Sequence, residues 1–206
     1  MRDGIALFVL VLELPVPVFW LLVHPAVNFW RRHPRTCYYG VGLSAWLLVA
    51  AVLLVPRQWW LVERFSRHPL LALAGGALIV TDFWLLRQIE RRAGWRVLVG
   101  LPELGLRTET VPVVATGIYG RVRHPRYLGM LLSWTGAVLL SGATRLLWLV
   151  AGFTALALLA TELEERELLT RLGESYADYR RRVPRFIPRW RSPGESRGES
   201  SKEGAG

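Results

Sequence analysis

The chain has 206 residues, of which 52% are hydrophobic, with ten tryptophans, one cysteine and a formal net charge of +10 at pH 7. A single cysteine excludes an internal disulfide and a cysteine-based metal cluster. The hydrophobic fraction is close to that of soluble domains, but long apolar runs alternate with short arginine-rich segments. Arginines in that position are typical of membrane topology signals and of contacts with anionic lipids. We therefore predict an integral membrane protein with lipid partners, and no nucleic-acid partner.

The first 86 residues contain three apolar runs, at 5–23, 38–55 and 70–86. Each approaches the length of about 20 residues that a helix needs to cross a bilayer core. Residues 56–69 mix aromatic side chains with arginine, which indicates a short interfacial helix. Residues 1–86 are therefore predicted to form three N-terminal transmembrane helices.

Two carboxyl groups lie inside these apolar runs. Glu13 interrupts the first run together with Pro15, and Asp82 lies near the end of the third. A carboxyl at membrane depth is costly, so Glu13 is expected to be protonated or paired inside the helix bundle. In the middle of the third run, Gly75-Gly76 is expected to allow close helix packing. The sequence does not assign a role to Glu13 or Asp82.

A longer apolar run, residues 127–160, has 34 residues and a single charge, Arg145. One helix of that length would measure about 51 Å, against a hydrocarbon core of about 30 Å. The run is therefore predicted to be two spans, with Ser141-Gly142 as the natural turn. The two ends of such a helical hairpin lie on the same side of the membrane.

The predicted fold class is all-α, a polytopic membrane protein of about five transmembrane helices with this hairpin last. Residues 87–126 hold eight arginines against three glutamates, which places them in the cytoplasm under the positive-inside rule. The C-terminal segment then lies on the same side, and residues 87–190 form a second unit after 1–86. The Ser-, Gly- and Glu-rich residues 191–206 are expected to be disordered. The arginines of 56–69 lie outside in this topology, which counts against it.

The hairpin brings two polar segments to one end of the protein. Arg123, His124 and Tyr127 lead into the hairpin, and Glu164 and Glu165 follow it. The tripeptide Arg-His-Pro occurs three times in the chain, so it is weak evidence alone and is also compatible with simple helix-entry signals. Only the third copy is followed by Tyr127 and Gly129 and leads directly into an apolar span. The proximity of the two segments therefore depends on the hairpin.

The adjacent carboxylates Glu164 and Glu165 differ from their acidic neighbours. Glu162 and Glu167 each have an arginine four residues later, which is the favourable order for an ion pair on a helix. Glu164 and Glu165 have no cation three or four residues away on either side. They are expected to find partners elsewhere, such as a ligand with amino, hydroxyl or cationic groups. The alternative is a solvated helix face.

Other kinds of site lack support in the sequence. Four scattered histidines and one cysteine give no metal-ligand spacing, so no metal is predicted. The Gly-x-Gly-x-x-Gly fingerprint of soluble nucleotide-binding folds does not occur.

Two segments resemble the isoprenylcysteine carboxyl methyltransferase family, which is related to the membrane phospholipid methyltransferases. The first is Gly117-Ile118-Tyr119 followed by Arg123-His124-Pro125-Arg126-Tyr127-Leu128-Gly129. The second begins at Glu164-Glu165-Arg166-Glu167-Leu168 and ends at Val183-Pro184-Arg185-Phe186-Ile187-Pro188. Together they cover roughly residues 87–189, about half of the chain.

The resemblance implies an all-helical membrane enzyme that binds S-adenosylmethionine in its cytosolic C-terminal segment and methylates a lipophilic acceptor. It implies a multi-pass protein of the cell membrane, with its active site facing the cytoplasm. Glu164 and Arg123 would be catalytic. The implied cofactor-binding residues are Tyr119, His124, Pro125, Tyr127, Gly129, Glu164 and Glu165. The carboxylates would take the ammonium group and ribose hydroxyls of the cofactor, and His124 and Tyr127 would take its carboxylate.

One position departs from the family pattern. The enzymes that act on prenylcysteine carry an arginine four residues before the first glutamate, and this chain has Ala160 there. A prenylcysteine carboxyl is therefore in doubt as the acceptor, and the sequence does not identify whether O, N or S is methylated.

The alternatives to a methyltransferase are a non-catalytic accessory or transport protein of the same fold, and an enzyme of the related sterol-reductase fold.

Overall fold

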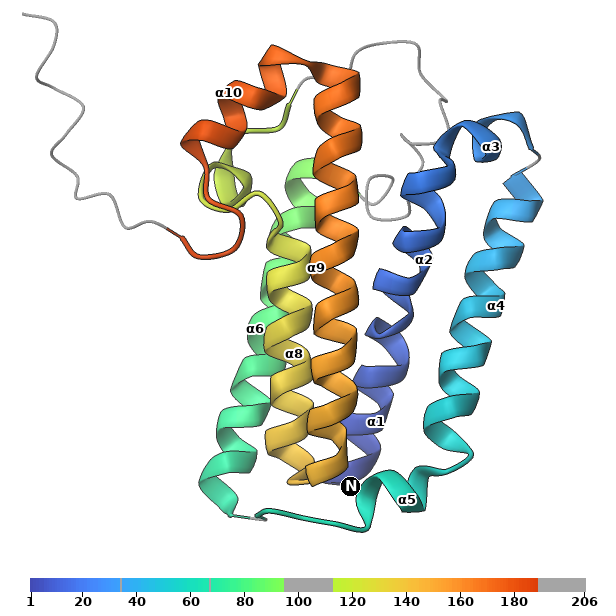
Figure 1. Ribbon diagram of the computed structural model, residues 1–206. Coiled ribbons are helices and arrows are strands. Elements are labelled where there is room, and N and C mark those ends of the chain that lie inside the picture. The colour runs from blue at the N-terminus through green and yellow to red at the C-terminus, as the bar shows by residue number, and fades with distance from the viewer. Residues whose placement is uncertain (34, 67, 95–112, 189–206) are drawn as a thin grey trace, which may run out of the picture.

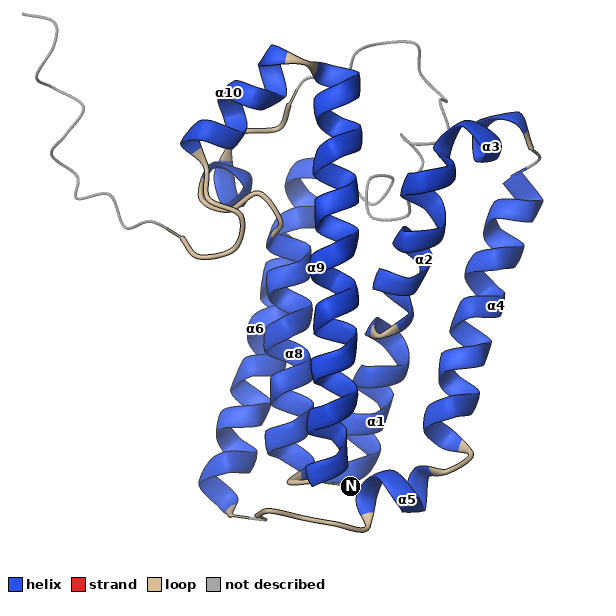
Figure 2. Cartoon of the chain, viewed as in Figure 1, coloured by secondary structure: helices blue, strands red, loops and turns tan. Residues whose placement is uncertain are grey.

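The computed structural model describes residues 1–33, 35–66, 68–94 and 113–188, and these are helical with no strand (Figures 1 and 2). The α-helices are α1 (Arg2–Glu13), α2 (Pro15–Val23), α3 (Val27–Arg32), α4 (Arg35–Leu54), α5 (Arg57–Leu61), α6 (Pro69–Ala93), α8 (Pro125–Ser141), α9 (Thr144–Leu172) and α10 (Glu174–Arg182). Two 3-10 turns, η1 (His24–Ala26) and η2 (Gly117–Gly120), complete the elements. The all-α prediction is confirmed, whereas the predicted disorder of 191–206 lies outside the described residues.

Helix α8 lies in the middle of the bundle, between α6 and α1, with α9 alongside (Figure 1). Helix α4 is the outermost helix beside α1 and α2, and α10 folds back against the end of α9. The short helix α5 runs across the opposite end, in the segment predicted to hold an interfacial helix (Figure 2).

Four helical segments are long and apolar enough to cross a membrane: Arg2–Ala26, Arg35–Leu54, Pro69–Arg92 and Thr144–Leu172. The first combines α1, α2 and η1, which are stacked end to end with Pro15 at the start of α2. Proline is accommodated there because the first turn of a helix does not use its missing N–H. The remaining predicted span is the first helix of the hairpin, α8, which has 17 residues and is buried along most of its length by its neighbours.

The predicted hairpin is confirmed, with its turn at the predicted position. Helix α8 ends at Ser141, Gly142 has a φ of 68°, and α9 begins at Thr144. A left-handed backbone favours glycine, and here a Cβ would also lie 1.6 Å from the carbonyl oxygen of Ser66. The amide of Phe65 donates to the Gly142 carbonyl at 3.0 Å. The turn is therefore held against the loop that follows α5.

Close packing was predicted at Gly75-Gly76, and the structure confirms it for Gly75. A Cβ on Gly75 would lie 2.5 Å from the Gly136 carbonyl oxygen of α8, and a Cβ on Gly136 would lie 2.5 Å from the Gly75 oxygen. Nothing lies within 4 Å of a Cβ added to Gly76. The contact of α6 with α8 therefore depends on the glycine pair Gly75 and Gly136.

Gly75→Ala is expected to lower the free energy of unfolding by about 1–3 kcal/mol, because the added methyl must push α6 away from α8. Gly76→Ala is the matched control. It should raise the free energy of unfolding by up to about 1 kcal/mol, since alanine is the better helix former and has space there. Denaturant-induced unfolding in detergent micelles measures both. Equal effects of the two changes would contradict the close contact.

A buried ion network joins three helices in the interior. Arg126 of α8 donates to Asp82 of α6 at 3.0 Å and to Glu13 of α1 at 3.3 Å. Glu13 is 2% exposed and Asp82 is 1% exposed. Pairing of Glu13 inside the bundle, one of the two expectations for it, is thus observed.

Candidate active site

The two polar segments predicted to meet do so around His124, the residue before α8. Its Nε2 lies 2.9 Å from Oε1 of Glu165, and its Nδ1 lies 3.5 Å from Oε2 of Glu164. The carboxylates stand on α9, and the hairpin turn between α8 and α9 returns them to the level of His124. Because a carboxylate faces each ring nitrogen, the imidazolium form fits this place. The proximity that the hairpin predicted is therefore present.

His124 is 5% exposed. Burial would lower its pKa, but the hydrogen bond and charge of Glu164, followed by those of Glu165, outweigh burial and raise its pKa above the ordinary value. A group whose pKa is raised by folding stabilises the folded state below its unfolded pKa, about 6.5 for histidine. That stabilisation is lost as the pH rises through the folded pKa.

The free energy of unfolding should therefore fall as the pH rises through the folded pKa of His124. His124→Gln should remove this component, because glutamine does not titrate. Unfolding in micelles over a pH series, with the variant's curve subtracted from that of the wild type, isolates it. Parallel curves would contradict the paired imidazolium.

Glu165 is 1% exposed and surrounded by cations. Its oxygens lie 3.0 Å from the Arg123 guanidinium, 3.1 Å from that of Arg185 and 3.4 Å from Nε of Arg180, in addition to the contact with His124. The expected partner elsewhere in the fold is therefore a group of arginines from this chain. Glu165 joins the segment before α8 to the segment after α10.

Arg123 anchors the C-terminal segment. Its guanidinium donates to Glu165 and to the carbonyls of Arg180 and Val183. The amide of Arg123 donates to the Pro184 carbonyl at 2.9 Å, and the amide of His124 donates to the Arg185 carbonyl at 3.1 Å. The catalytic role predicted for Arg123 stays a prediction, while its contacts hold the chain around the site.

Glu164 differs from its neighbour because its side chain is 30% exposed. Its charge acts on both His124 and His24, the latter in the turn η1 after α2. Of the two adjacent carboxylates, Glu164 is thus the one with surface left for a ligand.

The other predicted residues lie around His124 in different settings. Tyr127 is 5% exposed, and its ring packs edge-on against that of His124 with centroids 6.0 Å apart. Tyr119 accepts a hydrogen bond through its carbonyl from the Tyr179 hydroxyl at 2.7 Å, and burial raises the pKa of Tyr179 to about 12. Pro125 is buried as the first residue of α8. Their predicted contacts with a cofactor stay predictions.

Gly129 is placed away from these residues. A Cβ there would lie 2.2 Å from Oδ1 of Asp82, so glycine lets the Asp82 carboxylate reach the backbone of α8. This contact serves the ion network of Arg126, and the predicted part of Gly129 in a cofactor pocket stays a prediction.

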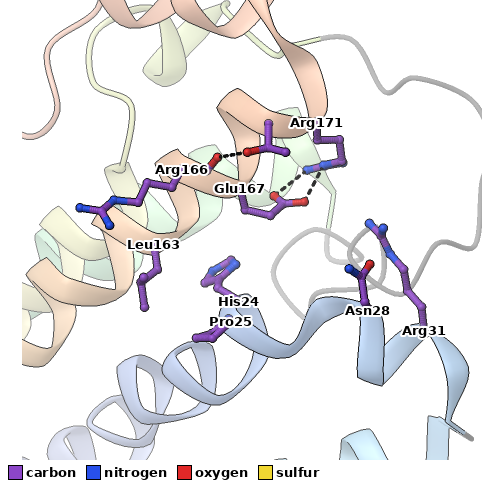
Figure 3. A pocket seen from close by; sticks show the side chains of 9 residues that line it. His24, Pro25, Asn28, Arg31, Leu163, Arg166, Glu167 and Arg171 are labelled. Carbon is purple, nitrogen blue, oxygen red and sulfur yellow. Dashed lines mark hydrogen bonds and ion pairs between the residues drawn. The ribbon is translucent and has the colours of Figure 1, made fainter.

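Sequence reasoning missed a cavity of about 490 Å³ between α9 and the turn after α2 (Figure 3). Its wall includes His24, Asn28, Arg31, Glu167, Thr170 and Arg171. The only available signal was the His-Pro pair at His24, which recurs throughout the chain. Arg180 and Arg185 beside Glu165 were also missed, although Arg185 belongs to the second resembling segment.

Comparison with known proteins adds a family match. Residues 70–175 match the family model described as phospholipid methyltransferase. Methanethiol S-methyltransferase 2 of Bradyrhizobium diazoefficiens is 33% identical over 163 residues, which are 78% of this chain and 52% of the relative. Methanethiol S-methyltransferase of Mycobacterium tuberculosis is 31% identical over 179 residues, 78% of this chain and 69% of the relative.

A shorter similarity links the chain to Delta(14)-sterol reductase of Mus musculus, with 37% identity over 92 residues, 39% of this chain and 21% of the reductase. No solved structure matches. The chain spans about half the length of the Bradyrhizobium relative.

Proposed function

Because this chain belongs to the phospholipid methyltransferase family, we propose that it transfers a methyl group from S-adenosylmethionine to a small lipophilic thiol at a membrane surface. Both methyltransferase relatives are named for methanethiol. The observation that carries the proposal is the meeting of His124 with Glu164 at 3.5 Å, beside a cavity, between segments that the hairpin brings together.

The residues present fit the proposed cofactor, which is a zwitterion with a sulfonium. Glu164 offers a partly exposed carboxylate for its ammonium group or ribose hydroxyls. On α9, the cavity near it carries Arg166 and Arg171, which suit the cofactor carboxylate, and His124 and Tyr127 are the further groups predicted for that end. When bound, the cofactor supplies a methyl group already activated by the positive sulfur. The task left to the chain is positioning and electrostatic stabilisation.

Ala160 supports a thiol acceptor over a prenylcysteine carboxyl. Its side chain is 0% exposed and packs in the main core cluster of the bundle. An arginine that could hold an acceptor carboxylate therefore does not stand at this position. An acceptor without a carboxylate, such as a small thiol, needs no such cation.

We place the site on the cytoplasmic face of the cell membrane. The end of the bundle that carries His124 also carries Arg31 and Arg32 of α3 and Arg91 and Arg92 of α6 (Figure 1). Arg92 reaches within 3.1 Å of a Cβ built on Gly117, at the start of η2. Arginines at one end of a helix bundle favour a cytoplasmic location for that end.

Calorimetric binding of S-adenosylmethionine to the full chain in detergent tests the proposal. We expect Glu164→Gln and His124→Gln each to weaken binding at least about tenfold, since each removes a charge-assisted contact of about 1.5–3 kcal/mol. Glu174→Gln is the control, because that side chain is 89% exposed on α10. Methylation of a small thiol, followed by gas chromatography of the thioether, completes the test. A folded wild type that binds reduced nicotinamide but no S-adenosylmethionine would overturn the proposal in favour of a reductase.

A further inference from the structure

His24 is a buried histidine without a hydrogen-bond partner among the described residues. It is 7% exposed, and neither ring nitrogen has a partner there. Its ring stacks on Trp20, with centroids 5.0 Å apart and planes 18° apart. Leaving a buried polar group unpaired usually costs about 1–3 kcal/mol, and such groups in native proteins call for an explanation.

The free nitrogens of His24 belong to the wall of the cavity of about 490 Å³. Figure 3 shows the ring directed from the end of α2 towards α9, in the space between Leu163 and Glu167. A cavity of this volume falls within the usual range for small-molecule sites, about 300–1,000 Å³. The position thus offers an unpaired imidazole to a ligand.

The arginines of the cavity wall outnumber its carboxylates, while the largest electrostatic effects on His24 come from the carboxylates Glu164 and Glu167. The wall carries three arginines, Arg31, Arg166 and Arg171, against one carboxylate, Glu167. Glu167 is itself paired with Arg171 at 3.0 Å. The titratable groups that act on His24 from neighbouring elements are Glu164, Glu167 and Arg171 of α9 and His124 before α8. Nearby arginines lower the pKa of a thiol and stabilise the thiolate, which is the nucleophilic form.

Only one wall of the cavity belongs to the part of the chain that matches the family model. Leu163, Glu167 and Arg171 of the α9 wall fall within residues 70–175, which match the family model, as do Glu164 and His124 near that wall. His24, Asn28 and Arg31 fall outside that match. A shared methyl donor would be held by the matched part, which leaves the other wall to recognise the acceptor of this chain.

We propose that His24 is the base that removes the proton of the acceptor thiol, and that Arg31 stabilises the resulting thiolate. This inference rests on the proposed function. The S–H bond breaks, the proton moves to a ring nitrogen of His24, and the electron pair stays on sulfur. That pair would form the new bond to the methyl carbon while the methyl–sulfonium bond of S-adenosylmethionine breaks, and the electrons of the broken bond would stay on the departing sulfur as a neutral thioether. The imidazolium returns its proton to water after the product leaves.

The first test needs no methyl donor. Ethanethiol is titrated into the cofactor-free protein, and the ultraviolet absorbance of the thiolate is recorded at a pH below the pKa of the free thiol. We expect a thiolate signal from the wild type and none from His24→Gln. His33→Gln is the matched control, because His33 lies outside the cavity, bonded to the Phe29 carbonyl at 2.8 Å. Equal signals from wild type and His24→Gln, or no signal from either, would overturn the proposal.

The second test is the pH profile of thiol methylation. His24→Gln should lose about 10²–10⁴-fold in kcat/KM near neutral pH, the usual contribution of a general base. The loss should shrink as the pH approaches the thiol pKa, because the thiolate then forms unaided. Arg31→Gln should shift the rising limb of the profile to higher pH. A loss that stays constant with pH would show a merely structural role and contradict the inference.

Calorimetry separates the two proposals. His24→Gln should bind S-adenosylmethionine as the wild type does, which also shows that the variant is folded. Wild type that fails to bind the cofactor would overturn the proposed function itself. Normal cofactor binding together with equal thiol methylation by His24→Gln and wild type would overturn only the role of His24.

Discussion

Replacing Arg126 with glutamine is expected to lower the free energy of unfolding by about 3–5 kcal/mol, the usual cost of removing one partner from a buried ion pair. Its guanidinium is the cation shared by Glu13 and Asp82, from two other helices. The second oxygen of each carboxylate has no hydrogen-bond partner in the described part of the chain. Without Arg126, two acidic groups would remain in a bundle interior where water cannot solvate them. The measurement is denaturant-induced unfolding in detergent micelles.

Two further variants separate the network from a general effect of losing an arginine. Arg145→Gln removes an ion pair with Glu63 whose members are 23% and 56% exposed, and it should cost no more than about 1 kcal/mol. Combining Arg126→Gln with Glu13→Gln and Asp82→Asn should recover much of the loss, because no unpaired charge then remains buried. Equal costs for Arg126→Gln and Arg145→Gln would show that the network does not stabilise the bundle.

Glu165→Gln is expected to lower the free energy of unfolding by about 3 kcal/mol or more and to release the segment after α10. The buried carboxylate neutralises Arg123 and His124, which are 10% and 4% exposed, so its removal leaves Arg123 without that counter-charge and leaves His124 paired with Glu164 alone. Limited proteolysis within residues 183–188, together with unfolding in micelles, measures both effects.

The neighbouring change provides the control. Glu164→Gln should leave proteolysis and stability nearly unchanged, within about 1 kcal/mol, because its carboxylate is partly exposed and pairs with His124 alone in the described part of the chain. We therefore expect Glu165 to contribute to stability and Glu164 to contribute to binding of the proposed cofactor. If Glu164→Gln opened the C-terminal segment as readily as Glu165→Gln, the division of labour between them would be wrong.

The sequence predicted the parts of the fold that depend on local patterns. The length of the apolar run 127–160 required a break, and Ser141-Gly142 offered one where the turn is found. That break was enough to bring His124 to the paired glutamates. The unpartnered pattern of Glu164 and Glu165 along their helix also correctly indicated partners from elsewhere in the fold.

Local sequence patterns could not predict the contacts between distant segments. Arg126 meets Glu13 across 113 positions of the chain, and no spacing rule relates a residue in the first helix to one at the start of α8. In the sequence, His24 could not be distinguished from the other histidines that precede proline. Its burial and its unpaired ring nitrogens arise only when α9 packs against the end of α2. Gly129 belonged to a recognised motif, and only the packing of α6 showed that it faces Asp82.

The length of α9 sets the depth of the site relative to the lipid. The helix has 29 residues, about 43 Å at 1.5 Å per residue, so it is longer than a hydrocarbon core of about 30 Å. Glu164 comes 20 residues after Thr144 at its start, which places it about 30 Å along the axis. If Thr144 marks one boundary of the hydrocarbon, the carboxylate emerges at the other. The proposed methyl donor, which is soluble in water, and the proposed thiol acceptor, which dissolves in lipid, would then meet at this boundary without either entering the other's solvent.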